Sequence, residues 1–527
     1  MRNKGYSGIR LFIITFLIVC VILPLLSLFL NIKGKDIQEI FTSPQFMLML
    51  KNSLLTTTIA TFISVGLAFI LAWFINRSNM KYKSIFSMLF ALPMLIPSIS
   101  HGMGLVLLLG DNGIITNLLG IDIGLYGYPG IIIGSILYSF PVAFLMLTDI
   151  FRYEDYTTYE AAQVLGLSKA RQFLTITIPN LKGALISAIF AVFTMIFTDY
   201  GVPLVVGGKI MTLPVYMYRE VIGLLDFSKG AIIGIILLIP AFIAFLLDFK
   251  SDANDNGSTV TRDYIIGTNK TRDIVAYVFC GITVILISLP LFAFAYLSLV
   301  KQFPFDMRFS FVHIQEVLDL GLVFYLKNSL AVALVTSLLG TFVIYFTAYI
   351  TSRSKRTLTN LMIHLVSMLT LAIPGVVLGL CYVLFFQGTF IYGTLTILIL
   401  VNSVHFFASP YLLAYNSLSK FNRNLEDVAV TMGIGKFRIL KDVYMPCTQD
   451  TLLEMFSYLF VNCMVTISAV SFIANFKNMP LALLIPQFDS QSLIEATAFI
   501  SIMILAVNGI MKLSVYLLKR YSVKHDG

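Results

Sequence analysis

Long apolar runs alternate with short polar segments along nearly the whole chain. The hydrocarbon core of a bilayer is about 30 Å thick, and an α-helix crosses it in about 20 apolar residues. Measured against that length, the pattern predicts an all-α, polytopic membrane protein with twelve spans. They are expected near residues 11–30, 52–75, 84–109, 129–149, 183–203, 230–248, 274–299, 328–350, 358–385, 393–417, 451–475 and 493–511.

The composition excludes a soluble enzyme. Of the 527 residues, 58% are hydrophobic and 12% are charged, whereas soluble domains carry about 25% charged residues. Arg2, Lys4 and Arg10 precede the first apolar run, as in a signal peptide. That run is longer than a signal peptide's, and no small-residue cleavage site follows, so an uncleaved anchor is predicted.

The sequence carries no pattern typical of a metal site or a catalytic site. The five cysteines lie far apart without CxxC or Cys/His spacing, so we expect them to be small buried hydrophobic residues. The spans lack paired carboxylates, a histidine cluster or a Ser/His/Asp set, so no catalytic residue, metal or cofactor is predicted. The cysteines are Cys20, Cys280, Cys381, Cys447 and Cys463.

Basic residues gather in alternate loops. If the N-terminus is cytoplasmic, 26 of the 36 Lys and Arg fall on the cytoplasmic side and the other 10 outside. This bias follows the positive-inside rule and predicts that both termini are cytoplasmic. The net charge of +9 is thereby explained by topology, and nucleic acid binding has no support.

The sequence repeats itself. Lys51-Asn52-Ser53-Leu54 opens the second predicted span, and the same four residues open the eighth at Lys327, 276 positions later (327 − 51). Two six-span halves, 1–249 and 274–527, are predicted, joined by a flexible cytoplasmic linker at 250–273 without evident chemistry. Because six is even, the halves are expected to be parallel repeats.

The two longest predicted cytoplasmic loops between spans share one spacing. In the first, Glu160-Ala161-Ala162 is followed by Gly166 and then by Pro179. In both loops the acidic residue precedes the glycine by six positions, and the proline follows the glycine by thirteen. The matching residues of the second loop are Asp427, Ala429, Gly433 and Pro446, with Glu426 just before them.

This pattern resembles the EAA loop of the permease subunits of bacterial ABC importers. The resemblance implies a type I importer permease fold in the inner membrane, a coupling helix that docks into a cytoplasmic ATP-binding subunit, and an external solute-binding protein. The second loop departs from the pattern at Asp427 and Val428. We expect Ala161 and Ala162 on the outer surface, where a groove of the partner could approach closely, and a φ > 0 at both glycines.

The chain has no ATP-binding loop of its own. Neither Gly208-Lys209-Ile210 nor Gly435-Lys436-Phe437 completes the GxxxxGK[ST] sequence of a phosphate loop. ATP hydrolysis is therefore expected in a separate subunit. The alternatives are a secondary transporter with two parallel halves, disfavoured because buried charges for a proton relay are missing, and a membrane-embedded enzyme.

Polar groups inside spans are candidates for the solute pathway. Asp199 and Tyr200 lie late in the fifth span, and Ser468 holds a roughly corresponding place in the second half. The stretch 197–242 is similar to fused permeases of the ferric-iron type, and within them to those assigned to 2-aminoethylphosphonate uptake. The resemblance therefore favours 2-aminoethylphosphonate as the solute, with ferric iron or thiamine as alternatives. Weaker candidates, more typical of hydrogen bonds between helices, are His101, Asn402, His405 and Glu454.

Overall fold

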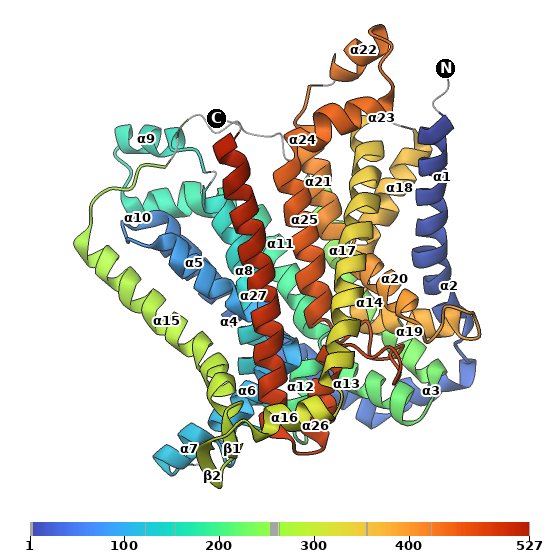
Figure 1. The fold of residues 1–527 in the computed structure, drawn as a ribbon. Helices are drawn as coiled ribbons and strands as arrows, with labels where there is room; N and C mark the ends of the chain where they lie inside the picture. Colours follow the sequence, from blue (N-terminus) through green and yellow to red (C-terminus); the bar gives the residue numbers. More distant parts are fainter. Residues whose placement is uncertain are drawn as a thin grey trace. The chain divides into compact units, whose positions relative to one another are not determined.

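The structure, a computed structural model, describes residues 4–121, 123–152, 154–252, 262, 264–354, 357–422 and 424–525. Within these ranges the regular structure is helical, apart from an antiparallel pair of short strands (Figure 1). The prediction of an all-α fold is confirmed. The two strands are β1 (Val300–Gln302) and β2 (Asp306–Phe309).

The chain forms two compact units, and each takes helices from both predicted sequence halves. The α4 unit comprises Phe41–Tyr216 and Ile239–Phe309. The α17 unit comprises Met1–Ile40, Met217–Leu238 and Ser310–Gly527. The two compact units therefore do not coincide with the two predicted sequence halves. The boundaries of those halves in the sequence remain a prediction.

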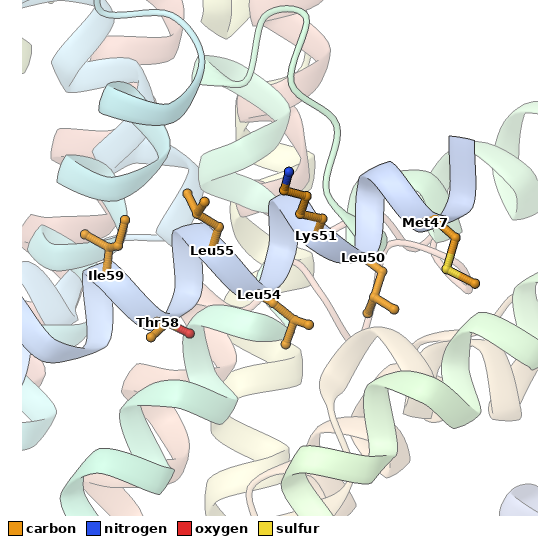
Figure 2. A pocket seen from close by; sticks show the side chains of 7 residues that line it. All are labelled: Met47, Leu50, Lys51, Leu54, Leu55, Thr58 and Ile59. Carbon is orange, nitrogen blue, oxygen red and sulfur yellow. The ribbon is translucent and has the colours of Figure 1, made fainter. Parts of the chain in front are cut away.

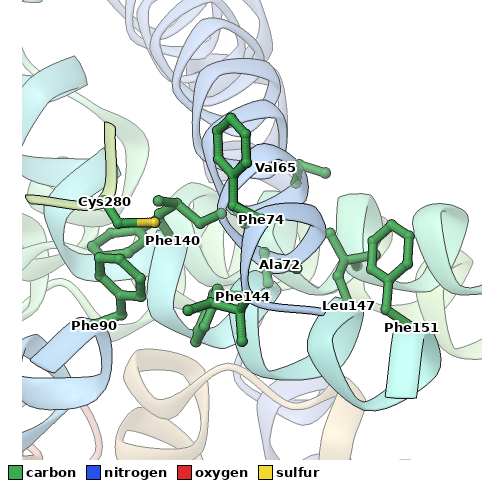
Figure 3. Packing of buried hydrophobic residues seen from close by; sticks show 14 of the residues in the cluster. Val65, Ala72, Phe74, Phe90, Phe140, Phe144, Leu147, Phe151 and Cys280 are labelled. Atoms are coloured by element: carbon green, nitrogen blue, oxygen red, sulfur yellow. The ribbon is translucent and has the colours of Figure 1, made fainter. Parts of the chain in front are cut away.

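The α4 unit is built on α4 (Pro44–Arg77), which packs against α8 (Tyr128–Arg152) and α11 (Ile178–Phe197). Ala68 and Ala72 on α4 are fully buried, because small side chains let neighbouring helices approach closely. Figure 3 shows Ala72 in the hydrophobic cluster to which the rings of Phe90, Phe140, Phe144 and Phe151 also belong. The other helices of this unit are α5 (Lys83–Ala91), α6 (Ser98–Leu109), α7 (Ile114–Leu119), α9 (Thr157–Val164), α10 (Lys169–Gln172), α12 (Gly201–Val206) and α15 (Lys270–Leu297).

The α17 unit is built on α17 (Leu322–Arg353), which packs against α21 (Ala408–Ser419) and α25 (Gln449–Val465). Its first helices pack onto late ones: the hydroxyl of Tyr382 in α19 donates a hydrogen bond to the carbonyl of Cys20 at 2.9 Å. The other helices are α1 (Lys4–Leu17), α2 (Leu23–Leu30), α16 (Val312–Asp319), α18 (Leu358–Leu369), α19 (Gly375–Phe386), α20 (Leu395–His405), α22 (Asn424–Thr431), α23 (Lys436–Ile439), α24 (Met445–Cys447), α26 (Leu484–Ser490) and α27 (Ile494–His525). Three helices cross the unit boundaries: α3 (Gly34–Thr42), α13 (Leu213–Tyr218) and α14 (Phe227–Asp252).

The Asn-Ser pair that marks the repeat makes equivalent contacts in the two units. In the α4 unit, Ser53 Oγ accepts a hydrogen bond from the N–H of Leu213 at 2.8 Å. In the α17 unit, Ser329 Oγ accepts one from the N–H of Leu481 at 2.6 Å. The preceding asparagine also donates to a nearby carbonyl in each unit. Each pair thus ties its long helix to the chain that follows the fifth span of that half.

The spans differ from prediction where proline intervenes. Among the residues that the structure describes, eight helices are long and apolar enough to cross a membrane, or ten if each of two bent pairs counts as one span. The predicted single spans 84–109 and 358–385 are both broken, and α18 and α19 are bent by 113°. Proline lacks an N–H and clashes with the preceding turn, so the helices restart at Pro97 and Pro374. The shorter apolar helices among the described residues are Lys83–Leu95 and Phe227–Ile243.

The cysteines follow the prediction with one exception. Cys20, Cys280, Cys381 and Cys463 are buried, as expected for small hydrophobic side chains. Cys447 is exposed, so the prediction was wrong for it. It lies in α24, in the polar segment that leads into α25, rather than inside an apolar run.

Candidate functional site

The two EAA loops, residues 157–179 and 424–446, have one design. Each begins with a short helix, α9 or α22, which Figure 1 shows beyond the ends of the longer helices of its unit. Gly166 has φ +71° and Gly433 has φ +69°, so the predicted positive φ is confirmed. In each loop the glycine N–H and the next N–H donate back to the helix carbonyls, the pairing that ends a helix in a left-handed turn.

After the glycine, both loops return to a long helix through a π-helical segment. The first π-helical segment is Phe173–Thr177 and the second is Leu440–Tyr444. Pro179 and Pro446 follow as the second residue of the next helix. A proline cannot donate to the carbonyl four residues back, and the wider turn accommodates that loss. The two loops thus share the spacing of glycine and proline, and their backbones follow the same path from the short helix to the long one.

A buried cluster anchors the first EAA loop to the end of α4. Arg77, the last residue of α4, forms an ion pair with Glu154, and both side chains are under 7% exposed. The hydroxyl of Tyr159 in α9 donates to Glu154 and lies 2.7 Å from Thr177 Oγ1. Burial, together with the neighbouring carboxylate, raises the pKa of Tyr159, so the hydroxyl stays protonated as a donor.

The second EAA loop has the same chemistry with two residues exchanged. Arg353, the last residue of α17, lies 276 positions after Arg77 and donates to both oxygens of Glu426 at 2.7 and 2.6 Å. The hydroxyl of Tyr444 also donates to Glu426. Here the glutamate lies on the loop helix and the tyrosine on the π-helical segment, whereas in the first loop the tyrosine lies on the loop helix and the glutamate lies just before it. Burial raises the pKa of Glu426, but these hydrogen bonds outweigh it and hold the pKa below its ordinary value of 4.5.

The EAA residues do not all face outward. Ala161 is exposed, but Ala162 is 3% exposed, so the expectation that both alanines lie on the outer surface was wrong for Ala162. Tyr159 lies three residues earlier on the same face of α9. Its hydrogen bond to the buried Glu154 turns this face, and Ala162 with it, toward the interior of the unit. Ala429 is buried in the same way, at 6%. The other predicted loop residues divide as follows: Glu160 pairs with Arg262, Glu426 pairs with Arg353, and Asp427, Pro179 and Pro446 are exposed.

Large apolar side chains are exposed close to each glycine. Val164 and Leu165 are 88% and 77% exposed in the first loop, and Val430 and Met432 are 72% and 68% exposed in the second. Exposed apolar groups that cluster in this way mark interaction surfaces. The sequence shows them as hydrophobic residues beside the glycine of a polar loop, a signal that the EAA pattern alone does not include.

Asp199 is engaged locally. Its carboxylate accepts hydrogen bonds from the N–H groups of Gly201 at 3.3 Å and Val202 at 2.9 Å, the first residues of α12. It also accepts one from Ser98, the first residue of α6. The side chain therefore joins the start of α12 to the break in the third span, while Tyr200 beside it is 1% exposed.

Ser468 occupies the corresponding place in the α17 unit. A Cβ at Gly375, the first residue of α19, would overlap with Ser468 Oγ and with the His405 ring. Two of the weaker candidates, Asn402 and His405, lie three positions apart on α20. His101 Nε2 lies 3.1 Å from the carbonyl of Pro93, Asn402 donates to the carbonyl of Leu398, and Glu454 pairs with Lys519.

A hollow on the surface of α4 does not assemble a solute site. All seven residues that line it come from α4, and they lie along one side of that helix (Figure 2). They are apolar except for Lys51 and Thr58. This arrangement is a helix face open to its surroundings rather than an enclosed cavity.

These observations define a class: a multi-pass helical membrane protein with two loops of equivalent backbone geometry, each with exposed apolar side chains beside a glycine turn. Residues 64–252 and 340–523 each match the family described as "Binding-protein-dependent transport system inner membrane component". The chain belongs to this family. The matches begin 276 positions apart (340 − 64), the offset of the Lys-Asn-Ser-Leu repeat, so the chain is a fused ABC permease with two permease halves.

Relatives of the ferric type align over most of the chain. It is 24% identical over 500 residues to the putative ferric transport system permease protein FbpB 1 of Haemophilus influenzae, which covers 89% of this chain and 78% of the relative. It is 22% identical to the Fe(3+)-transport system permease protein FbpB 2 of the same organism, over 97% and 99% of the two chains. A bacterial alginate ABC transporter, solved with an alginate-bound periplasmic protein, matches 48% of this chain and 95% of its own at 18% identity and TM-score 0.41.

Proposed function

We propose that the chain is the permease subunit of an ATP-driven importer whose two EAA loops dock onto cytoplasmic ATP-binding subunits, one for each loop. The observation that carries this proposal is the duplicated loop: the same glycine turn, π-helical segment and buried Arg–Glu–Tyr cluster occur in both units. The exposed apolar side chains beside each glycine supply the contact surface. ATP is hydrolysed by the partner, and movement of α9 and α22 passes into α11 and α25.

In this proposal both loops and both termini face the cytoplasm, in keeping with the bias of 26 to 10 in basic residues. A solute-binding protein delivers the solute to the opposite face, as the family description implies for a binding-protein-dependent system. The pathway then runs past the breaks in the third spans, where Asp199, Tyr200 and Ser468 lie.

For the solute, ferric iron is the first candidate because the relatives that align over most of the chain are named as ferric transport permeases. The second candidate is 2-aminoethylphosphonate, supported by the resemblance of residues 197–242. An ammonium group could approach Asp199, although that carboxylate already accepts three hydrogen bonds. Selectivity in either case resides mainly in the binding protein.

Affinity purification of the tagged chain from its native membrane tests the class. Co-purification of an ATP-binding protein, and uptake that stops when ATP is depleted while the proton gradient is kept, are the expected results. Uptake that follows the proton gradient without ATP would instead establish a secondary transporter.

A deletion strain tests the solute. Loss of radioactive ferric iron uptake with normal growth on 2-aminoethylphosphonate as sole phosphorus source supports the first candidate. The opposite pair of results supports the second, and normal behaviour in both assays rejects both solutes.

A further inference from the structure

Arg262 and Tyr264, two residues of the predicted linker, lie on the first EAA loop. The carbonyl of Arg262 accepts a hydrogen bond from the N–H of Tyr156 at 3.0 Å, and its guanidinium forms an ion pair with Glu160. The ring of Tyr264 packs edge-on against the rings of Tyr156 and Tyr159, with centroids 5.2 and 5.1 Å apart. The sequence predicts a linker without evident chemistry, whereas these residues make several contacts with one loop.

Tyr264 also completes the surroundings of Arg77. The guanidinium carbon of Arg77 lies 3.5 Å from the centre of the Tyr264 ring, where a cation is attracted to the aromatic face. In the second loop, Arg353 donates instead to the carbonyls of Phe421 and Asn422 at 2.7 and 2.8 Å. The linker thus supplies a contact to Arg77 through Tyr264, whereas Arg353 obtains its additional contacts from the residues just before its own loop.

The end of the linker is fixed close by. Asp273 in the first turn of α15 accepts a hydrogen bond from the N–H of Asn79 at 3.0 Å, and the carbonyl of Gly267 accepts one from the Asn79 side chain at 3.2 Å. Asn79 lies two residues beyond Arg77, the last residue of α4. The described part of the linker therefore touches both α9 and the segment after α4.

We propose that the linker is a working part of the first EAA loop, in which Arg262 and Tyr264 are positioning residues that hold α9 against the end of α4. This inference rests on the proposed coupling function. A load applied to α9 then reaches α4 through Tyr264 and Arg77, in addition to reaching α11 along the chain. Without these contacts α9 moves without carrying α4, and ATP hydrolysis proceeds with less import.

The test uses the complete transporter in proteoliposomes with its ATP-binding subunit and binding protein. The probe is whichever of radioactive ferric iron and labelled 2-aminoethylphosphonate the wild-type complex accumulates. An Arg262→Ala, Tyr264→Ala double variant is expected to lower the ratio of solute imported to ATP hydrolysed roughly three- to tenfold, the range open to one exposed ion pair and one cation–π contact. Bound ATP-binding subunit stays at its wild-type amount.

Matched variants separate positioning from folding. Ile265→Ala with Thr268→Ala changes exposed positions of the same segment and leaves the ratio unchanged, while Tyr264→Phe keeps the ring and retains the ratio. A wild-type ratio in the Arg262→Ala, Tyr264→Ala variant overturns the inference and leaves the proposed function standing. A wild-type complex that binds no ATP-binding subunit overturns the proposed function itself.

A charge reversal tests the Arg262–Glu160 pair. Arg262→Glu alone places two acidic groups together and lowers the ratio, and the double variant Glu160→Arg, Arg262→Glu restores it. If Glu160 acted only on the ATP-binding subunit, Arg262→Glu would have no effect and the double variant would be as defective as Glu160→Arg. That result would remove the pair from the mechanism.

Discussion

Gly166 and Gly433 carry the clearest consequence at the scale of single residues. Their φ values of +71° and +69° cost a side chain with a Cβ roughly 1–2 kcal/mol, and a β-branched valine strains the turn further. The Gly166→Val, Gly433→Val double variant is expected to reach the membrane in normal amounts and to lose solute uptake, because both loop helices are misdirected.

Uptake assays and immunoblots of membranes measure the two quantities. Gly509→Val is the control, since that glycine lies in α27 with open space around it. Wild-type uptake by the double variant would show that the left-handed turns are dispensable.

Asp199 allows a distinction between a charge and a helix cap. Gly201 and Val202 donate to different oxygens of Asp199, so asparagine keeps one of these bonds through its amide oxygen, whereas alanine keeps neither, at a cost of about 1 kcal/mol. We expect Asp199→Asn to transport at a rate near wild type and Asp199→Ala to transport less and unfold at a lower temperature in detergent. Equal loss of uptake in both variants, with unchanged stability, would instead assign the negative charge to the solute.

Predictions for single residues succeeded where they concerned the backbone conformation alone. Glycine spacing was enough to predict the positive φ at Gly166 and Gly433. The direction in which Ala162 points depends on Tyr159 and Glu154, and their partner Arg77 is 77 positions away from Glu154 in the sequence. Periodicity cannot show such a contact, so the inward face of α9 and the exposed Leu165 were missed.

The second Arg–Glu–Tyr cluster ties α22 to α17 and gives this loop a defined response to pH. Since the folded state lowers the pKa of Glu426 below 4.5, its stabilising effect is complete above that value and is lost as pH falls through the lowered pKa. Glu426→Gln is expected to destabilise the protein by about 2 kcal/mol near neutral pH, the scale of hydrogen bonds to a charged group.

Thermal unfolding in detergent measures this effect. The difference between wild type and Glu426→Gln should stay constant from about pH 5.5 to pH 8 and shrink below about pH 4. Asp427→Asn, at the exposed neighbouring position, serves as the control. A difference that disappears already near pH 7 would contradict the lowered pKa.

Helices were predicted better than the angles between and within them. The prolines of the third spans are visible in the sequence, yet the 20-residue length rule counts apolar positions and contains no term for direction. It therefore joined α18 and α19, which the structure bends by 113°. The π-helical segments before Pro179 and Pro446 were not predicted either, because their residues differ little from those of an ordinary helix.

The topology of the whole molecule is testable by cysteine labelling on a background without native cysteines. Gln163→Cys and Thr431→Cys occupy exposed positions of the two EAA loops. Both are expected to resist an impermeant maleimide in intact cells and to react after permeabilisation. Phe305→Cys, in the exposed turn between β1 and β2, should react in intact cells. Labelling of either loop position from outside would reverse the proposed orientation.

The exchange of helices between sequence halves has a consequence for synthesis on the ribosome. Apart from Met217–Leu238, the α4 unit is one stretch that ends at Phe309, so its parts are all available once that residue has been made. The α17 unit combines Met1–Ile40 with Ser310–Gly527. Helix α1 packs against α17 and α18, and α2 packs against α19, so the helices that are translated first remain without these neighbours until residues 322–386 have been made.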